Sequence, residues 1–238
     1  MKTVLCSKTG SVFSIVLNRP EVINAFNVQM RDELYMSLGS ACDDPTVKVI
    51  AISGAGERGF CAGADLGEFG SAPSIATARE VRWERDLWGM FLSVKKPVIV
   101  ALHGYVIGSG LEIACLGDIR IASRDAVFSM PEAALGLLPA AGGSQTLARV
   151  VGQSRAVEIL QMGIKIDADK AKNIGLVHEV IPRKNLHDRL LSVSNSLASI
   201  NPSLLAAVKR SVNEGMDLSL EGGIRLEKRL AASSIQAL

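Results

Sequence analysis

The chain has 238 residues, of which 48% are hydrophobic and 21% charged, as is typical of a soluble globular protein with a sizeable core. Its net charge of +2 and aromatic content of 4% exclude the one-sided basic surface and the stacking platforms that nucleic-acid binding requires. No apolar stretch reaches the roughly 18 residues of a membrane span, and the first residues lack the apolar run of a signal peptide. We therefore expect a cytoplasmic protein without a membrane partner.

The first half of the sequence alternates predicted strands with predicted helices. Strands are expected at 12–17, 47–53, 97–102, 118–122 and 126–129. Helices are expected from Asn27, which can cap one, to about residue 42, then at about 74–93, and directly after Gly108-Ser109-Gly110. Strands joined by helices imply an α/β fold with a mainly parallel, right-handed core.

After Pro131 the pattern becomes helical. Helical spacing is found near 142–150, 154–162, 168–173, 186–200, 202–213 and 218–235, with one short strand at 177–180. We expect a core of residues 1–190 that contains the active site, followed by a C-terminal helical region of residues 191–238. Four widely spaced cysteines without a CxxC pair are interpreted as reduced thiols, and three scattered histidines make a metal site improbable.

Two familiar motifs are present only in part. Residues 54–59 match GxGxxG, but the chain continues into a Gly-rich stretch instead of a helix, which argues against a dinucleotide site. Ser109 lies between two glycines, yet a nucleophile elbow needs glycines two residues away on either side, where this chain has Ile107 and Leu111. A serine nucleophile is therefore a weak alternative.

Two carboxylates lie in unusually apolar surroundings. The positions three and four residues from Glu112 are small or apolar, unlike those on a solvated helix face. Glu132 follows Pro131, so its position also fits an ordinary helix start, and for this residue the two interpretations stay open. Burial raises a carboxyl pKa, and two neighbouring carboxyls can share one proton. One acid can then activate water while the other delivers a proton, as addition of water to a carbon–carbon double bond requires.

Two Gly-rich turns could polarise the reacting group. Residues 60–66 and 108–110 combine small side chains with main-chain N–H groups, and the second turn opens an apolar helix. Paired N–H donors of this kind stabilise a developing negative oxygen, and removing one typically costs about 3 kcal/mol. Each turn alone could be a simple strand-to-helix connection.

Taken together, these motifs resemble the enoyl-CoA hydratase/isomerase (crotonase) superfamily. The resemblance runs from about Val12 to the end of the chain. It is carried by 17–20 (LNRP) with Asn24-Ala25, 60–66 (FCAGADL), 104–112 (GYVIGSGLE), Pro131-Glu132, 138–145 (LPAAGGSQ), 166–168 (IDA) and 175–177 (GLV).

The resemblance implies a spiral of ββα turns with a C-terminal helical trimerisation region, forming a homotrimer or a dimer of trimers. It implies that the two hydratase glutamates are Glu112 and Glu132, 20 residues apart. The thioester carbonyl would be held by the N–H groups of Ala62 and Ser109, and the N–H of Ala140 would help to hold the water. The remaining residues of the implied acyl-CoA site are Glu21, Val22, Ala25, Gly63, Ala64, Asp65, Leu66, Gly108 and Pro131. Coenzyme A belongs to the substrate, so no separate cofactor is expected.

The sequence departs from the family pattern at two points. Ser109 replaces a usual glycine, and the chain stops at Leu238 where relatives usually continue through another helix. The leading hypothesis is an enoyl-CoA hydratase. A Δ3,Δ2-enoyl-CoA isomerase, in which Glu132 alone moves the proton, is the first alternative. A non-catalytic coenzyme A-binding or scaffolding homologue is the second.

Overall fold

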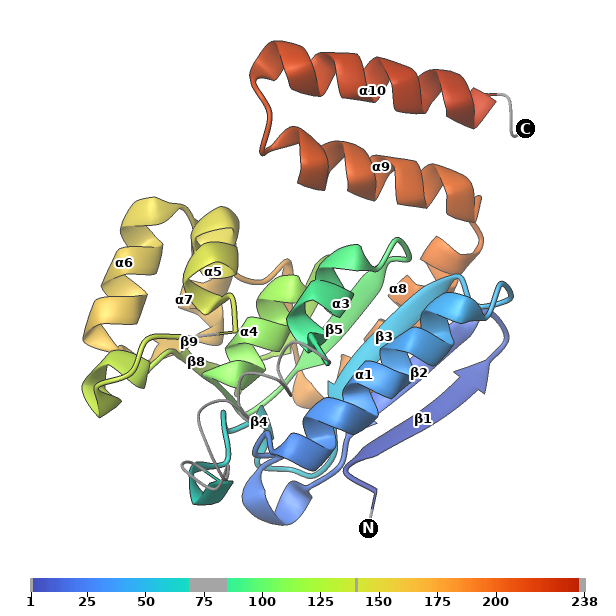
Figure 1. The fold of residues 1–238 in the computed structure, drawn as a ribbon. Coiled ribbons are helices and arrows are strands. Elements are labelled where there is room, and N and C mark those ends of the chain that lie inside the picture. The colour runs from blue at the N-terminus through green and yellow to red at the C-terminus, as the bar shows by residue number, and fades with distance from the viewer. Residues whose placement is uncertain (1, 69–84, 140, 236–238) are drawn as a thin grey trace.

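The computed structural model describes residues 2–68, 85–139 and 141–235 (Figure 1). Within them the larger sheet has six strands in the order β1-β2-β3-β5-β7-β10. These are β1 (Val4–Thr9), β2 (Val12–Leu17), β3 (Val49–Gly54), β5 (Val98–Leu102), β7 (Ile119–Ser123) and β10 (Glu179–Ile181). All neighbouring pairs are parallel except β1 with β2, which form an antiparallel hairpin.

The sheet is buried on both faces by helices. Helix α1 (Val28–Asp43) covers one face and α8 (Leu186–Ala198) the other. Alternate side chains of a strand point to opposite faces, so Ile50 and Ile52 join the α1 side while Val49 and Ala51 join the α8 side. This double burial explains why β3 and β5 are almost wholly apolar.

The strands of a smaller sheet alternate along the chain with strands of the larger one. It has the order β4-β6-β8-β9, from β4 (Gly59–Cys61), β6 (Tyr105–Ile107), β8 (Val127–Ser129) and β9 (Ile166–Asp167). Each of its first three strands comes directly after a strand of the larger sheet, which gives the repeating ββα arrangement of a spiral. The ends of β4, β6 and β8 lie next to one another because these strands are parallel neighbours.

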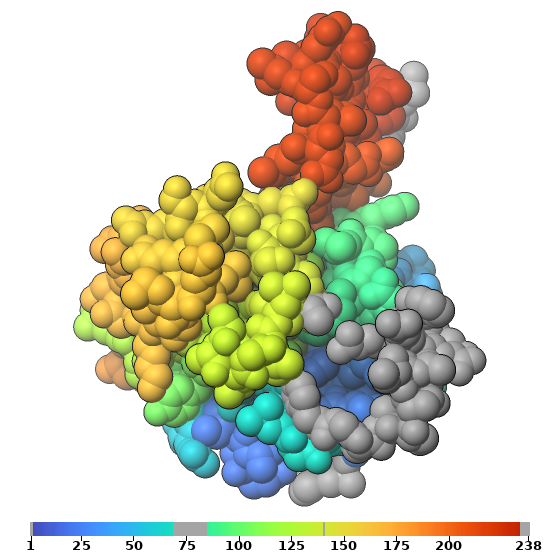
Figure 2. Space-filling view, turned by 60° about the vertical axis from the view of Figure 1, so that its left-hand side comes forward, coloured from blue at the N-terminus to red at the C-terminus, as the bar shows by residue number. Residues whose placement is uncertain are grey.

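The remaining helices lie mostly in the C-terminal part. They are α3 (Leu87–Ser93), α4 (Ser109–Leu116), α5 (Gly143–Val151), α6 (Gln153–Met162), α7 (Ala168–Asn173), α9 (Pro202–Gly215) and α10 (Leu220–Ile235). Short 3-10 turns are η1 (Pro20–Val22), η2 (Leu66–Glu68), η3 (Glu132–Leu135) and η4 (Arg183–Asn185). Helices α9 and α10 pair with each other and project from the body of the molecule (Figure 2).

The predicted fold is confirmed in class and differs in detail. Strands β1, β4, β6 and β9 were not predicted, and the strand expected at 177–180 is β10, two residues later. The main-chain N–H of Val177 donates instead to the carbonyl of Ala171, near the end of α7. Of the helix expected at 74–93, residues 74–84 lie outside the described part, and α3 begins at Leu87. The boundary expected after residue 190 falls inside α8.

Two kinds of feature are absent from the described residues. None of the helices there combines the length and apolar character that crossing a bilayer requires. Histidine, cysteine and acidic side chains form no group of three suited to a metal ion in the same ranges.

Candidate active site

Three segments meet at the edge of the smaller sheet: the turn after β4, the turn between β6 and α4, and the start of η3. The main-chain N–H of Gly108 donates to the carbonyl of Ser129 at 3.0 Å, which ties the second segment to the third. A Cβ added to Gly63 would lie 3.2 Å from the carbonyl oxygen of Ile107, so the first two segments also touch. Gly63 and Gly108 both have positive φ angles, of 96° and 49°, which side chains rarely adopt.

Glu112 lies in the first turn of α4, which is buried nearly all around, and its side chain is only 3% exposed. Its Oε1 accepts hydrogen bonds from the main-chain N–H groups of Ala141 and Gly143, each at 3.2 Å. A Cβ at Gly143 would approach this oxygen to 2.7 Å. Glycine at position 143 is therefore what lets the start of α5 close over the carboxylate.

Glu132 is the first residue of η3 and is half-buried. A Cβ on Gly108 would lie 2.6 Å from its Oε1, so this carboxyl packs directly against the turn that opens α4. Its Oε2 is buried and has no hydrogen-bond partner among the residues described. The two acids thus differ in their surroundings: main-chain donors hold Glu112, whereas one oxygen of Glu132 has none.

The two carboxyls affect each other electrostatically. Burial, and after it repulsion from Glu132, raise the pKa of Glu112 to about 7, although the two N–H donors and the Ser109 hydroxyl oppose the rise. Burial also raises the pKa of Glu132. Both shifts act in the direction that lets the pair retain a proton closer to neutral pH than isolated carboxyls would.

The N-terminus of α4 supplies free main-chain donors. The first hydrogen bond of this helix runs from the N–H of Glu112 to the carbonyl of Gly108 at 2.9 Å. The preceding N–H groups, beginning with that of Ser109, have no carbonyl four residues earlier within the helix. The predicted donor at Ser109 is thus available, and the helix dipole adds to its positive potential.

The donor predicted at Ala62 requires correction. The N–H of Ala62 donates to the carbonyl of Ile23 at 2.9 Å, so it is not free to bind a ligand. At the next residue, the carbonyl of Gly63 accepts from the N–H of Phe26 at 2.8 Å. A trans peptide directs its C=O and N–H to opposite sides, so the N–H of Ala64 points away from Phe26. Ala64 is exposed, and within the described part of the chain its N–H has no acceptor.

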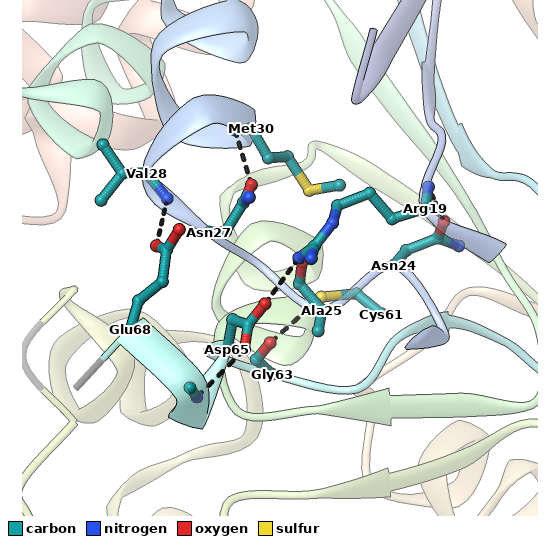
Figure 3. Close-up of polar contacts among 11 residues, drawn as sticks. Arg19, Asn24, Ala25, Asn27, Val28, Met30, Cys61, Gly63, Asp65 and Glu68 are labelled. Carbon is teal, nitrogen blue, oxygen red and sulfur yellow. Dashed lines mark hydrogen bonds and ion pairs between the residues drawn. The ribbon is translucent and has the colours of Figure 1, made fainter. Parts of the chain in front are cut away.

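The other expected binding residues surround these turns. Glu21 and Val22 form the exposed η1, while Leu66 begins η2 with 61% of its surface exposed. Ala25 and Asp65 are partly buried and share a contact with Arg19 (Figure 3). Pro131 leads into Glu132, and Ala140 lies outside the described residues.

Sequence reasoning missed three groups at the site. Ala141 and Gly143, the donors to Glu112, were noted only as part of a family motif, although paired glycines before a helix are a signal for an exposed N-terminus. Arg19 was noted only within its motif as well. The ion pair between Arg19 and Asp65 could not be predicted from the sequence, because the two residues are 46 positions apart.

Comparisons with known proteins point to one family. The family model described as enoyl-CoA hydratase/isomerase matches residues 7–238. The mitochondrial enoyl-CoA hydratase of Pongo abelii is 37% identical over 95% of this chain and 77% of its own length. The 2,3-dehydroadipyl-CoA hydratase of Escherichia coli is 34% identical over 97% of this chain and 89% of its own. The solved structure of an enoyl-CoA hydratase from Bacillus anthracis superposes with a TM-score of 0.92 at 31% identity, covering 98% of this chain and 91% of that one.

Proposed function

Because the chain belongs to the enoyl-CoA hydratase/isomerase family, we propose that it is an enoyl-CoA hydratase that uses Glu112 and Glu132 as its acid–base pair. The observation that carries this proposal is the difference between the two carboxyls. Glu112 receives two main-chain N–H bonds, which favour its ionised form, whereas the Oε2 of Glu132 receives none. We therefore propose that the reacting state, in the substrate complex, has Glu112 ionised and the proton on Glu132; in the free protein, Glu112 reaches its ionised form as the pH rises through its pKa of about 7.

This arrangement supports a balanced reaction. Ionised Glu112 takes a proton from water as the water oxygen bonds to the β-carbon of a 2-enoyl thioester. Protonated Glu132 delivers its proton to the α-carbon, and the product is a 3-hydroxyacyl thioester. Proton exchange with solvent returns the pair to its starting state, and the same groups run the dehydration in reverse. The chain itself provides these groups, so we propose that no cofactor besides the coenzyme A of the substrate takes part.

The thioester oxygen must be stabilised while negative charge develops on it. We assign this role to the N–H groups of Ala64 and Ser109, which lie in the two touching turns. Exposed leucines nearby, Leu66 on η2 and Leu135 on η3, offer apolar contacts for an acyl or pantetheine chain. Glu21, Val22, Ala25 and Asp65 are proposed to form the adjoining coenzyme A wall, Asp65 through its main chain because its carboxylate is bound by Arg19.

We further propose that copies of the chain assemble as a homotrimer or a dimer of trimers. The projecting α9–α10 pair carries exposed apolar side chains at a four-residue spacing, Leu204, Val208 and Val212, which support burial against another copy. A cytoplasmic location remains an expectation.

The hydration of crotonoyl-CoA, followed as loss of ultraviolet absorbance by the conjugated thioester, tests the function. Glu112→Gln and Glu132→Gln should each lower kcat by about 100-fold or more. Full turnover by Glu112→Gln would contradict the two-acid mechanism. If that variant still isomerised a 3-enoyl-CoA at the wild-type rate, the isomerase alternative would replace hydration. Absence of any turnover by the wild type, at every acyl length, would favour a non-catalytic coenzyme A-binding protein.

A further inference from the structure

An ion pair links the turn after β4 to the segment that precedes α1. The Nη1 of Arg19 lies 2.8 Å from the Oδ2 of Asp65 and donates to the carbonyl of Ala25 at 2.6 Å (Figure 3). Asp65 directly follows Ala64, and Ala25 directly precedes Phe26, the residue that pairs with Ala64. One guanidinium nitrogen therefore joins both sides of the contact that orients the Ala64 peptide.

We propose that Arg19 and Asp65 are a positioning pair that fixes the direction of the Ala64 N–H toward the substrate oxygen. The proposal rests on the proposed function, because it gives that N–H its role. Phe26 and Ala64 pair as an isolated bridge outside the named strands, with two hydrogen bonds: Phe26 N–H to Gly63 C=O, and Asp65 N–H to Phe26 C=O. The bridge has no further strand on either side, and the next main-chain bond between the two segments is that from the Ala62 N–H to the Ile23 carbonyl. The ion pair adds a side-chain connection at Asp65, the residue directly after Ala64.

The Arg19 end of this connection is itself fixed. The main-chain N–H of Arg19 donates to the Oδ1 of Asn24 at 2.8 Å, and the N–H of Asn24 donates back to the carbonyl of Arg19 at the same distance. Asn24 is fully buried, and its Nδ2 contacts three carbonyls, those of Ala55, Gly59 and Phe60. Ile23 and Asn24 both adopt left-handed backbone angles, which persist only where the surroundings hold them.

The Asp65 end is oriented as well. Its Oδ1 accepts from the N–H of Gly67 at 3.1 Å, so one carboxylate oxygen holds the turn while the other meets Arg19. Arg19 lowers the pKa of Asp65, which keeps the pair ionised at neutral pH. The two side chains are 19% and 24% exposed, so the pair is partly shielded from water. With its Nη1 shared between Asp65 and Ala25, Arg19 is better suited to position the backbone than to bind a coenzyme A phosphate.

The experiment compares three variants with the wild type. Asp65→Asn keeps the shape of the side chain and an acceptor for Gly67, but removes the charge. Arg19→Lys keeps the charge and loses the planar fork. Glu179→Gln is the matched control: it breaks the Arg189–Glu179 contact of 2.8 Å between α8 and β10, an ion pair of the larger sheet. Circular dichroism melting at fixed protein concentration identifies any variant that has lost its fold.

Two readouts separate positioning from a general structural role. Steady-state hydration of crotonoyl-CoA should show kcat lowered roughly 10- to 100-fold in Asp65→Asn, with KM changed by less than about threefold. Arg19→Lys should retain part of the activity, and Glu179→Gln all of it. Cinnamoyl-CoA bound at saturation should absorb at longer wavelength on the wild type, because a polarised carbonyl lowers the excitation energy. Asp65→Asn should lose most of that red shift.

The outcomes distinguish the two proposals. Suppose that the wild type gives the red shift and that the folded Asp65→Asn and Arg19→Lys variants match it in both red shift and kcat. That result would overturn the positioning pair and leave the hydratase proposal intact. A rise in KM alone, with kcat and red shift kept, would also overturn it and assign Arg19 to coenzyme A binding. A wild type that neither hydrates nor shifts the spectrum would refute the proposed function itself.

Discussion

Replacing Glu112 by glutamine should make the protein more stable above neutral pH while abolishing most of its activity. The folded state keeps this carboxyl buried beside Glu132 and raises its pKa from 4.5 to about 7. An acid with a raised pKa opposes folding wherever the unfolded chain would be ionised. Glutamine avoids that cost, and its carbonyl oxygen can still accept from Ala141 and Gly143.

The magnitude follows from the two pKa values. Each whole pKa unit is worth about 1.36 kcal/mol, so the raised pKa of Glu112 lowers the free energy of unfolding by about 3 kcal/mol at pH 8 and by about 1 kcal/mol at pH 5, where only the unfolded chain is largely ionised. The sign is that of an acid whose folded pKa is raised. Its contribution to the free energy of unfolding falls as pH rises from 4.5 through 7, and it is constant above that range. The gain from Glu112→Gln should therefore be about 2 kcal/mol larger at pH 8 than at pH 5.

Urea unfolding of both proteins at pH 5 and pH 8, at one protein concentration, measures this difference directly. Comparing the variant with the wild type at each pH cancels the titration of all other groups that the substitution leaves unchanged. Equal differences at the two pH values would refute the raised pKa of Glu112. A variant that is less stable at pH 8 than the wild type would show that the carboxylate is stabilised, not strained, in the folded protein.

Three further predictions concern single residues around the core of the site. Gly108→Ala should lower kcat by about 100-fold, measured with crotonoyl-CoA, because its Cβ would push the Glu132 carboxyl out of place by overlap at 2.6 Å; unchanged kcat would mean that Glu132 can move freely. Asn24→Ala should lower the free energy of unfolding by about 2–4 kcal/mol in urea, because three carbonyls lose their donor; a loss below about 0.5 kcal/mol, the usual scale of surface changes, would contradict this. Burial lowers the pKa of His103 to about 4, so the free energy of unfolding of the wild type should fall as pH falls from 6.5 toward 4. His103→Gln should lose less stability over this range, and urea midpoints at pH 7 and pH 4.5 measure the difference. Parallel midpoints for the two proteins would argue that His103 is protonated in the fold.

Apolar patterning predicted the elements that the core buries. The strands near 47–53 and 97–102 were predicted from continuous apolar runs, which reflect the burial of both of their faces. Asn27 caps α1 as predicted, with its Oδ1 accepting from the N–H of Met30. Both acids were identified because their neighbours are apolar. The structure buries Glu112 and half-buries Glu132. The spiral arrangement, in contrast, was predicted from the family resemblance and not from periodicity.

Short-range patterns could not supply the details that depend on distant partners. β4 and β6 have three residues each, too few to show alternation, and they exist because parallel neighbours bind them. The Ala62 N–H was misassigned because its acceptor, the carbonyl of Ile23, belongs to a segment about 40 residues earlier whose left-handed backbone no sequence pattern indicated.

The peptide between Gly63 and Ala64 has a hydrogen-bonded carbonyl at one end, which accepts from the Phe26 N–H, and the proposed donor N–H of Ala64 at the other. Electron density withdrawn from its oxygen by the Phe26 N–H leaves its nitrogen a stronger acid, since bonds in a chain polarise one another. If the Ala64 N–H binds the thioester oxygen as proposed, the main-chain N–H of Phe26 strengthens that donor. Selection on that position would act through its backbone, so its side chain could vary while the electronic effect persists.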